Sequence, residues 1–482
     1  MRKELAEFGL ETAANLGTSY ADIRFVDGER RLVSVKNGNP DNISHTSESG
    51  YGVRVIVNNG WGFAGSFNVS KDGVKEAVDL AVKLAKASST TAKGEIKLAS
   101  TKTVEDRYES DVKKDPFAVP LEDILETLVS ADEAFREVSP HVRTTSGRLL
   151  ARVEGKYLAT SEGSRIEQRI VFCGGSGQGY VMESGLVQRR TYEINPRTMG
   201  WEYIESHDVP EMARDAGKEA EMLLKAEPCP TEIRTNLILD DPHMYLQIHE
   251  TIGHASELDR VLGTEADFAG MSFLTPEKLG SFRYGSDQVN FVADPTIPFG
   301  LGTYGYDDEG TPARKVYLVK DGMVNDYQSS RETAAQLGLE GSSAGMRAAT
   351  PVDLPIIRMN NICLEAGDSW KADEIIAETN EGILMRTTKM WSVDQRRLNF
   401  QFGCEVGWKI KEGELTEMIR DPTYTGISYE FWRGVDATAK DDWTLYGTTG
   451  CGKGRPSQGI YVGHGAATTR IKDVRIGITG RL

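Results

Sequence analysis

Cysteine is scarce in this chain of 482 residues, and its few cysteines are widely scattered. The five form no C-x-x-C pair and are odd in number: Cys173, Cys229, Cys363, Cys404 and Cys451. This usage excludes the disulfide framework of a small secreted protein and fits a reducing compartment. We therefore expect a cytoplasmic protein.

Long apolar runs and an excess of positive charge are also missing. No stretch reaches the ~20 uncharged apolar residues that a membrane-spanning helix needs. Residues 1–10 carry Glu4 and Glu7 within an apolar pattern, which favours an amphipathic first helix over a signal peptide. Lys and Arg number 56 against 72 Asp and Glu, which gives a net charge of −16. This balance argues against nucleic acid or an anionic membrane surface as a partner.

The first half of the chain repeats one arrangement of elements. Each copy is predicted to contain a helix, a small antiparallel meander and a second helix, because apolar residues recur there at helical and then at strand spacing. The helices are predicted at 2–16 and 71–87 in the first copy and at 121–137 and 209–226 in the second. Residues 89–120 are polar and are interpreted as the connection.

The second half is predicted to be mostly short strands, with turn signals such as Asp321-Gly322 and Glu412-Gly413 between them. Their number and spacing are typical of an antiparallel barrel or sandwich. We therefore predict an α+β fold. Its predicted domains are an N-terminal duplicated helix–meander–helix domain over 1–228, with repeats over 1–105 and 115–228, and a C-terminal β-rich catalytic domain over 229–482.

A single helix at the start of the second half carries the most informative residues. It is predicted to run from Asp241 to Gly263, since Pro242 suits a first helical position and apolar residues recur along one face. His249-Glu250, with His254 nearby, is similar to the pattern of zinc hydrolases. In those enzymes the histidines bind the metal and the glutamate activates water.

The spacing of these two histidines is unusual. In zinc hydrolases the second histidine is four positions after the first, whereas His254 is five positions after His249. On an ideal helix, ~100° per residue puts the two rings about 140° apart, so they cannot bind one ion. A π-bulge would bring them together, and Gly253 is a weak helix former in the required place. The sequence therefore predicts a distorted helix between the histidines, with Gly253 at or beside the distortion.

A third metal ligand has to come from elsewhere, and the residues alone leave two alternatives. Cys451 has glycine on both sides, and Lys453 favours the thiolate that zinc needs. Glu257 and Asp259 follow His254 on the predicted helix and could act as a carboxylate ligand or as partners behind the ligands. Spacing does not choose between Cys451 and Glu257.

Three other features are given ordinary interpretations from the residues alone. The acidic segment Asp307-Asp308-Glu309-Gly310 is predicted to be a solvated turn, and His464 is predicted to line a turn between glycines. Cys404 lies in a strand-like run and is predicted to pack as a small apolar residue.

Three segments in order resemble the TldD/PmbA metallopeptidase family, in its TldD-like, metal-bearing branch. They are His249–His254 with Glu257, Asp307–Pro312 with Lys320–Gly322, and Gly450–Lys453 with Val462–Gly465. The order and spacing of these segments match the family over nearly the whole chain. Tyr461 departs from the pattern, because proline is usual at its position, and this difference bears on loop shape more than on metal binding.

The resemblance implies a cytoplasmic zinc metallopeptidase that hydrolyses unfolded or flexible peptides. It implies that His249, His254 and Cys451 bind Zn²⁺ and that Glu250 is the general base. It also implies a homodimer, or a heterodimer with a PmbA-like (TldE) paralogue that lacks the metal motif. The alternatives are a non-catalytic peptide-binding or regulatory subunit of such a complex, and a structural zinc closed by Glu257.

Overall fold

The computed structural model describes residues 1–92, 94–268, 270–454 and 457–477 of the chain. One long sheet forms the first half of the protein. The elements of this half are α1 (Arg2–Asn15), β1 (Tyr20–Lys36), β2 (Asn39–Val57), β3 (Gly60–Ser66), α2 (Lys71–Ser89), β4 (Glu105–Glu109), α3 (Leu121–Glu137), β5 (Val142–Thr160), β6 (Arg165–Glu183), β7 (Leu186–Arg197), α4 (Glu202–Glu205) and α5 (Val209–Lys225). The strands run in the order β3-β2-β1-β5-β6, and β4 and β7 both pair with β6.

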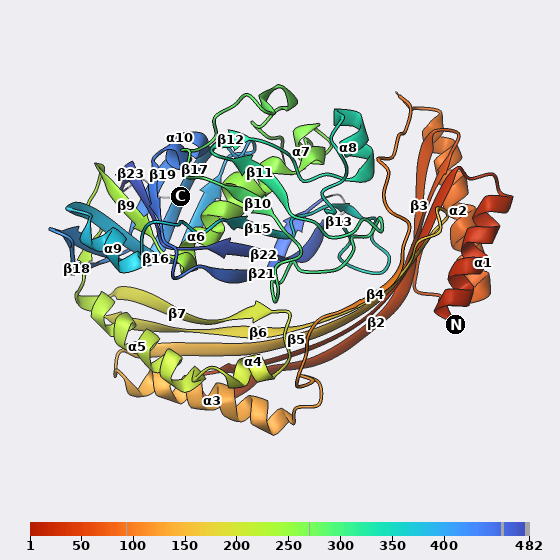
Figure 1. Ribbon diagram of the computed structural model, residues 1–482. Helices are drawn as coiled ribbons and strands as arrows, with labels where there is room; N and C mark the ends of the chain where they lie inside the picture. The colour runs from red at the N-terminus through yellow and green to blue at the C-terminus, as the bar shows by residue number, and fades with distance from the viewer. Residues whose placement is uncertain (93, 269, 455–456, 478–482) are drawn as a thin grey trace.

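The sheet curves strongly, and its two meanders are joined edge to edge through β1 and β5 (Figure 1). Helices α3 and α5 cover its convex side at one end, and α1 and α2 cover it at the other. The second half of the chain lies on the concave side.

The second half is built from a closed barrel and a separate sheet. Its elements are β8 (Glu227–Pro228), β9 (Ile233–Leu239), α6 (Asp241–Ile248), α7 (Leu258–Val261), β10 (Phe291–Ala293), β11 (Val316–Lys320), β12 (Met323–Val324), α8 (Arg331–Leu337), β13 (Met346–Arg347), β14 (Ile356–Ile357), β15 (Asn361–Leu364), α9 (Ala372–Ala377), β16 (Glu381–Val393), β17 (Asn399–Lys411), β18 (Glu414–Arg420), β19 (Thr423–Ile427), α10 (Ser428–Arg433), β20 (Val435–Thr438), β21 (Thr444–Lys453), β22 (Gln458–Ala466) and β23 (Thr469–Ile476). Strands β16-β9-β23-β19-β17 close on themselves because β17 also pairs with β16. The separate sheet has the order β12-β11-β10-β15-β22-β21.

Helix α6 lies between the barrel and this sheet. Met244 and Ile248 of α6 belong to one buried core with Phe402 of the barrel strand β17 and Val462 of β22. Burying apolar surface on both sides fixes the direction in which the following residues leave the helix. The packing of α6 therefore positions the His249 segment.

The predicted α+β fold class is confirmed, with a duplicated N-terminal half and a barrel in the C-terminal half. The strand predicted at 51–58 begins earlier, because β2 starts at Asn39, and β4 lies inside the segment interpreted as the connection. Residues 39–49 are mostly exposed and polar, so no apolar alternation marks them, although they pair with β1. The boundary at residues 228–229 stays a prediction. Within the described ranges, no helix combines the length and the apolar character that crossing a membrane requires.

The acidic segment Asp307–Glu309 is buried, so its prediction as a solvated turn is wrong. Arg24 of β1 and Lys156 of β5 both bind Asp308, and the Lys156 Nζ lies 2.5 Å from its Oδ1. The backbone N–H of Ala348 donates to Oδ2 at 2.9 Å. Burial alone would raise the pKa of Asp308, but the charges of Arg24 and Lys156 hold it well below its usual range.

A second pair of charges joins the two halves beside the first. Arg54 of β2 binds Asp22 at 2.7 Å and reaches Glu309 at 3.4 Å. The other oxygen of Glu309 accepts the backbone N–H of Arg331 at 2.8 Å. Buried charges are stable only when they are paired and hydrogen-bonded. The N-terminal sheet and the segment Asp307–Glu309 thus stabilise each other.

We predict that Asp308→Ala lowers the free energy of unfolding by about 3–5 kcal/mol, because it removes the carboxylate shared by two buried cations. Urea denaturation followed by tryptophan fluorescence measures the change. Asp79→Ala is the matched control, since Asp79 binds Lys75 at 2.9 Å on the exposed face of α2 and should shift the unfolding midpoint little. Equal shifts for both variants would contradict the structural role of Asp308.

Candidate metal centre

The helix that carries the histidines is distorted at the predicted place. Helix α6 changes at His249 into a π-helical turn, which ends at Gly253 and is followed by a 3₁₀ turn over His254–Ser256. The predicted distortion is confirmed. The single helix predicted as far as Gly263 is wrong, because Glu257 is extended and its neighbour Leu258 donates its backbone N–H to the carbonyl of Gln328 at 2.8 Å.

Close packing and side-chain hydrogen bonds hold the π-helical turn. A Cβ at Gly253 would lie 2.4 Å from the Sδ of Met359, so any larger residue here requires the buried Met359 side chain to shift. The Tyr284 hydroxyl donates to the carbonyl of Thr251 at 2.9 Å, and the Gln328 amide donates to the carbonyl of Gly253 at 2.5 Å. These partners satisfy carbonyls that regular helical bonding does not fully use.

The turn brings three possible metal ligands together. The donor atoms of His249, His254 and Cys451 all lie within 4.8 Å of one another, and the three side chains are buried. The Cys451 Sγ lies 3.6 Å from the His254 Nε2. Ligands at about 2.3 and 2.1 Å from a tetrahedral zinc are separated by about 3.6 Å, so the geometry of this pair fits such an ion.

A chain of hydrogen bonds sets the tautomer of His249. The His464 Nδ1 lies 3.2 Å from the carbonyl oxygen of Ile362, which can only accept, so this Nδ1 carries the proton. The His464 Nε2 then accepts from the His249 Nδ1, 2.8 Å away. The Nε2 of His249 is thereby left unprotonated, as a metal ligand must be.

His464 itself is fully buried in β22, so its prediction as a turn residue is wrong. The strand register places His464 opposite Ile362 of β15, and this brings the imidazole ring of His464 behind His249. Sequence spacing carries no signal for this contact, because it depends on the parallel pairing of strands about a hundred residues apart.

Glu257 has a similar position behind His254. Its Oε2 lies 2.9 Å from the His254 Nδ1, which leaves the His254 Nε2 directed at Cys451. Its Oε1 lies 3.4 Å from the Nζ of Lys453, and Asp259 binds the same Nζ at 2.6 Å. Among the described residues, the compact donor cluster contains His249, His254 and Cys451 and not these two carboxylates.

Charge around Cys451 favours its thiolate. Burial raises the pKa of the thiol, but a proton on the neighbouring His254 or His249 lowers it well below its usual range. Lys453 is two residues along the same strand and therefore lies on the same face of β21. It is fully buried, and Glu257 and Asp259 balance its charge.

Glu250 lines an open cavity of about 540 Å³ together with the three donor residues. Its carboxylate forms an ion pair with Arg397, which also lines the cavity. Sequence reasoning missed Arg397, because it lies in the turn between β16 and β17 and nothing in its local pattern marks a functional residue. The positive φ of 62° that it adopts is a conformation that few non-glycine residues take.

The chain matches models of a known protein family. Three family models described as PmbA/TldA metallopeptidase domains match residues 21–85, 114–224 and 233–478. The chain belongs to the PmbA/TldA metallopeptidase family. The predicted resemblance to its TldD-like branch is thereby confirmed, and several relatives carry TldD names.

Relatives in this family match over nearly the full length. A metalloprotease of Methanocaldococcus jannaschii is 33% identical over 94% of this chain and 95% of its own. A protein of Saccharolobus solfataricus named as a zinc metalloprotease TldD homolog is 22% identical over 97% of this chain and 98% of its own. The crystal structure of TldE from Thermococcus kodakarensis has the same fold, with a TM-score of 0.78 at 18% identity over 99% of this chain and 100% of that one.

We predict that Gly253→Val lowers the free energy of unfolding by about 1–3 kcal/mol, because the new side chain overlaps Met359 inside the π-helical turn. Urea denaturation measures the loss. Gly94→Val is the control, since no atom in the described part of the chain lies within 4 Å of a Cβ at that exposed position. A variant at Gly253 as stable as the Gly94 variant would show that the turn does not need glycine.

Proposed function

We propose that this member of the PmbA/TldA metallopeptidase family is a cytoplasmic zinc peptidase that hydrolyses unfolded or flexible peptides. In the proposal His249, His254 and Cys451 hold the zinc, and Glu250 is the general base. One observation carries it: three donor atoms converge beside a glutamate in an open cavity. The metalloprotease names of relatives support the same class of activity.

The donor set suits zinc. Imidazole nitrogens and a thiolate are its usual ligands, and three protein ligands leave a fourth position for substrate or water, as in catalytic sites. When bound, zinc supplies a Lewis acid that polarises the peptide carbonyl and lowers the pKa of water. His464 and Glu257, each behind one histidine, hold the rings in the tautomers that binding requires.

Glu250 is proposed to move the proton. Its carboxylate lies in the cavity, where it can accept a proton from the attacking water and pass it to the leaving amine. The ion pair with Arg397 holds the carboxylate in the cavity instead of leaving it free to rotate. Arg397 is therefore a positioning residue in this proposal.

The substrate is proposed to bind in an extended form along β21. This strand is at the edge of its sheet and carries Cys451, so a sheet edge borders the site. Asn195 and Arg197 bind backbone groups of Gly447 and Leu445 on this strand. No atom of the described residues lies within 4 Å of a Cβ position at Gly450 or Gly452, which leaves room for another chain. Main-chain pairing at a sheet edge gives little sequence specificity and requires an unfolded substrate.

The partner is proposed to be a second copy of the chain or a PmbA-like (TldE) paralogue. The likeness in fold to TldE supports an assembly of this type. The alternative function is a non-catalytic peptide-binding or regulatory subunit of such a complex. Glu250 beside the donor set favours the peptidase, because a binding subunit has no need of a base there. A structural zinc is disfavoured because Glu257 contacts the His254 Nδ1 on the side away from Cys451.

We predict about one zinc per chain after purification with zinc, measured by plasma mass spectrometry. His249→Ala and Cys451→Ala should reduce the zinc content to background. His464→Ala should weaken zinc binding about 10–100-fold in a competition with a chelating dye, because it frees the ring of His249. His45→Ala, at an exposed position, is the control. Zinc retained by both ligand variants would contradict the proposed site.

We predict that Glu250→Gln keeps its zinc but loses peptidase activity on unfolded casein about 10²–10⁴-fold, the usual contribution of a general base. Zinc content and the rate of casein cleavage are measured on the same preparation. Glu76→Gln, on the exposed face of α2, is the matched control and should cleave at the wild-type rate. A zinc-loaded wild type that binds casein without cleaving it would instead support the non-catalytic subunit.

A further inference from the structure

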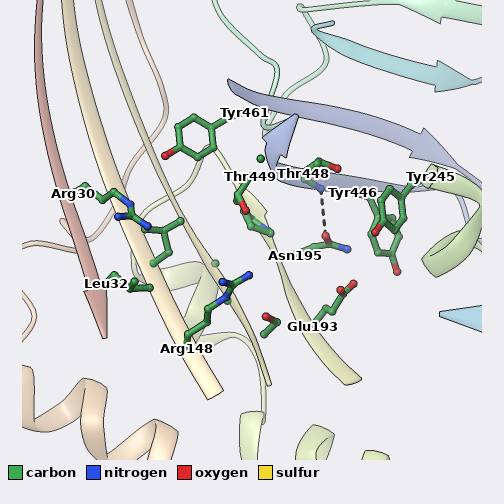
Figure 2. A pocket seen from close by; sticks show the side chains of 17 residues that line it. Arg30, Leu32, Arg148, Glu193, Asn195, Tyr245, Tyr446, Thr448, Thr449 and Tyr461 are labelled. Atoms are coloured by element: carbon green, nitrogen blue, oxygen red, sulfur yellow. Dashed lines mark hydrogen bonds between the residues drawn. The ribbon is translucent and has the colours of Figure 1, made fainter. Parts of the chain in front are cut away.

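A second cavity, of about 270 Å³, lies between the concave face of the N-terminal sheet and β21 (Figure 2). We call it the arginine cavity, after Arg30 of β1 and Arg148 of β5, which line it. Tyr245, Thr448 and Gly450 line both this cavity and the cavity of the candidate metal centre. The two cavities therefore share a wall, and a substrate at the metal centre borders on the arginine cavity.

The strand register places both arginines on the same face of the sheet. Leu32 of β1 lies opposite Leu150 of β5, and each arginine is two residues from one of these leucines. Side chains two residues apart on a strand share a face, so arginine and leucine side chains together form the floor of the cavity. Figure 2 shows Arg30 and Arg148 rising from this floor.

Neither of these arginines forms an ion pair with a carboxylate among the described residues, although Arg148 is near enough to Glu193 for its charge to act on that carboxyl. Other arginines of the same sheet do have one. Arg152, directly opposite Arg30, binds Glu48 and Glu154, and Arg190 of β7 binds Glu219 and Glu405. In a chain with more acidic than basic residues, two cations at a cavity that form no ion pair among the described residues are available to a ligand.

The remaining lining is polar and nearly neutral. Glu193 is the one carboxylate among the described lining residues. Burial, followed by the charge of Glu405, raises its pKa to about 7 against the opposing charges of Arg190 and Arg148. Its negative charge is therefore incomplete at neutral pH. Tyr245 and Tyr446 form a stacked wall with ring centroids 5.2 Å apart, and the Asn195 amide oxygen accepts the backbone N–H of Gly447 at 3.3 Å.

We propose that the arginine cavity binds a carboxylate of the peptide substrate while the peptide main chain crosses the candidate metal centre. The planar guanidinium matches a carboxylate with two parallel hydrogen bonds, which favours it over a neutral amide. The carboxylate belongs to an acidic side chain or to the C-terminus of the peptide, which share this chemistry. This inference rests on the proposed peptidase function. Main-chain pairing alone gives little sequence specificity, and the arginine cavity adds a preference for peptides with a carboxylate.

The test measures binding separately from cleavage. The probes are fluorescein-labelled peptides of glycine, alanine and serine with one glutamate or one glutamine, each with a free or an amidated C-terminus. Fluorescence anisotropy measures their affinity for the full-length Glu250→Gln protein, which does not depend on hydrolysis. Arg30→Gln and Arg148→Gln are added singly and together. Arg143→Gln is the control, since Arg143 is an exposed residue of β5 outside the cavity.

We expect about tenfold tighter binding of a carboxylate peptide than of its neutral counterpart, as a charge-assisted hydrogen bond provides. The cavity variants should lose this preference without weakening binding of the neutral peptide, and Arg143→Gln should keep it. A preference for glutamate identifies a side chain, and a preference for the free C-terminus identifies the chain end.

Two results would overturn the inference: equal binding of all four peptides by the unsubstituted cavity, or a preference that survives Arg30→Gln with Arg148→Gln. Its failure is separable from that of the peptidase. A zinc-loaded wild type that shows the preference but cleaves no peptide would refute the peptidase and leave the carboxylate site standing. Cleavage of peptides without any preference for a carboxylate would support the peptidase and refute the carboxylate site.

Discussion

The π-helical turn from His249 to Gly253 is the constraint on which the candidate metal centre depends. A regular helix would direct the two imidazoles apart, and the extra residue in the turn brings them to one side. The turn persists because its surroundings determine it: apolar packing on both sides of α6, Met359 against Gly253, and hydrogen bonds to its carbonyls. The barrel and the separate sheet thus act together to hold a local conformation that the segment would not keep alone.

Sequence reasoning worked where a property is local. Helix α3 has the predicted bounds, and the distortion at Gly253 followed from a spacing and a propensity. It failed where contacts between distant parts of the chain determine the structure of a segment or the burial of a residue. Residues 39–49 form a strand because β1 lies beside them, and Asp308 is buried because Arg24 and Lys156 arrive from another part of the chain. A single sequence shows acidic residues and basic residues but not which of them meet.

The same distinction applies to the candidate site. The histidine pair, Glu250 and Cys451 could be proposed from the residue types and from the family resemblance. His464 and Arg397 could not, because each reaches the site through strand register or a hairpin turn. These supporting residues decide the protonation of one ring and the position of one carboxylate. The chemistry of the centre is therefore distributed over more of the chain than its motifs suggest.

The donor set also has a consequence for the order in which the protein becomes competent. Cys451 follows His254 by 197 positions, and the strand that carries His464 comes later still. A chain emerging from the ribosome holds both histidines of the π-helical turn long before it holds the thiolate. Incomplete or truncated chains therefore lack a full set of donors. In a protein proposed to cleave unfolded polypeptides, a nascent chain would therefore lack a complete centre until the strand with Cys451 has been synthesised.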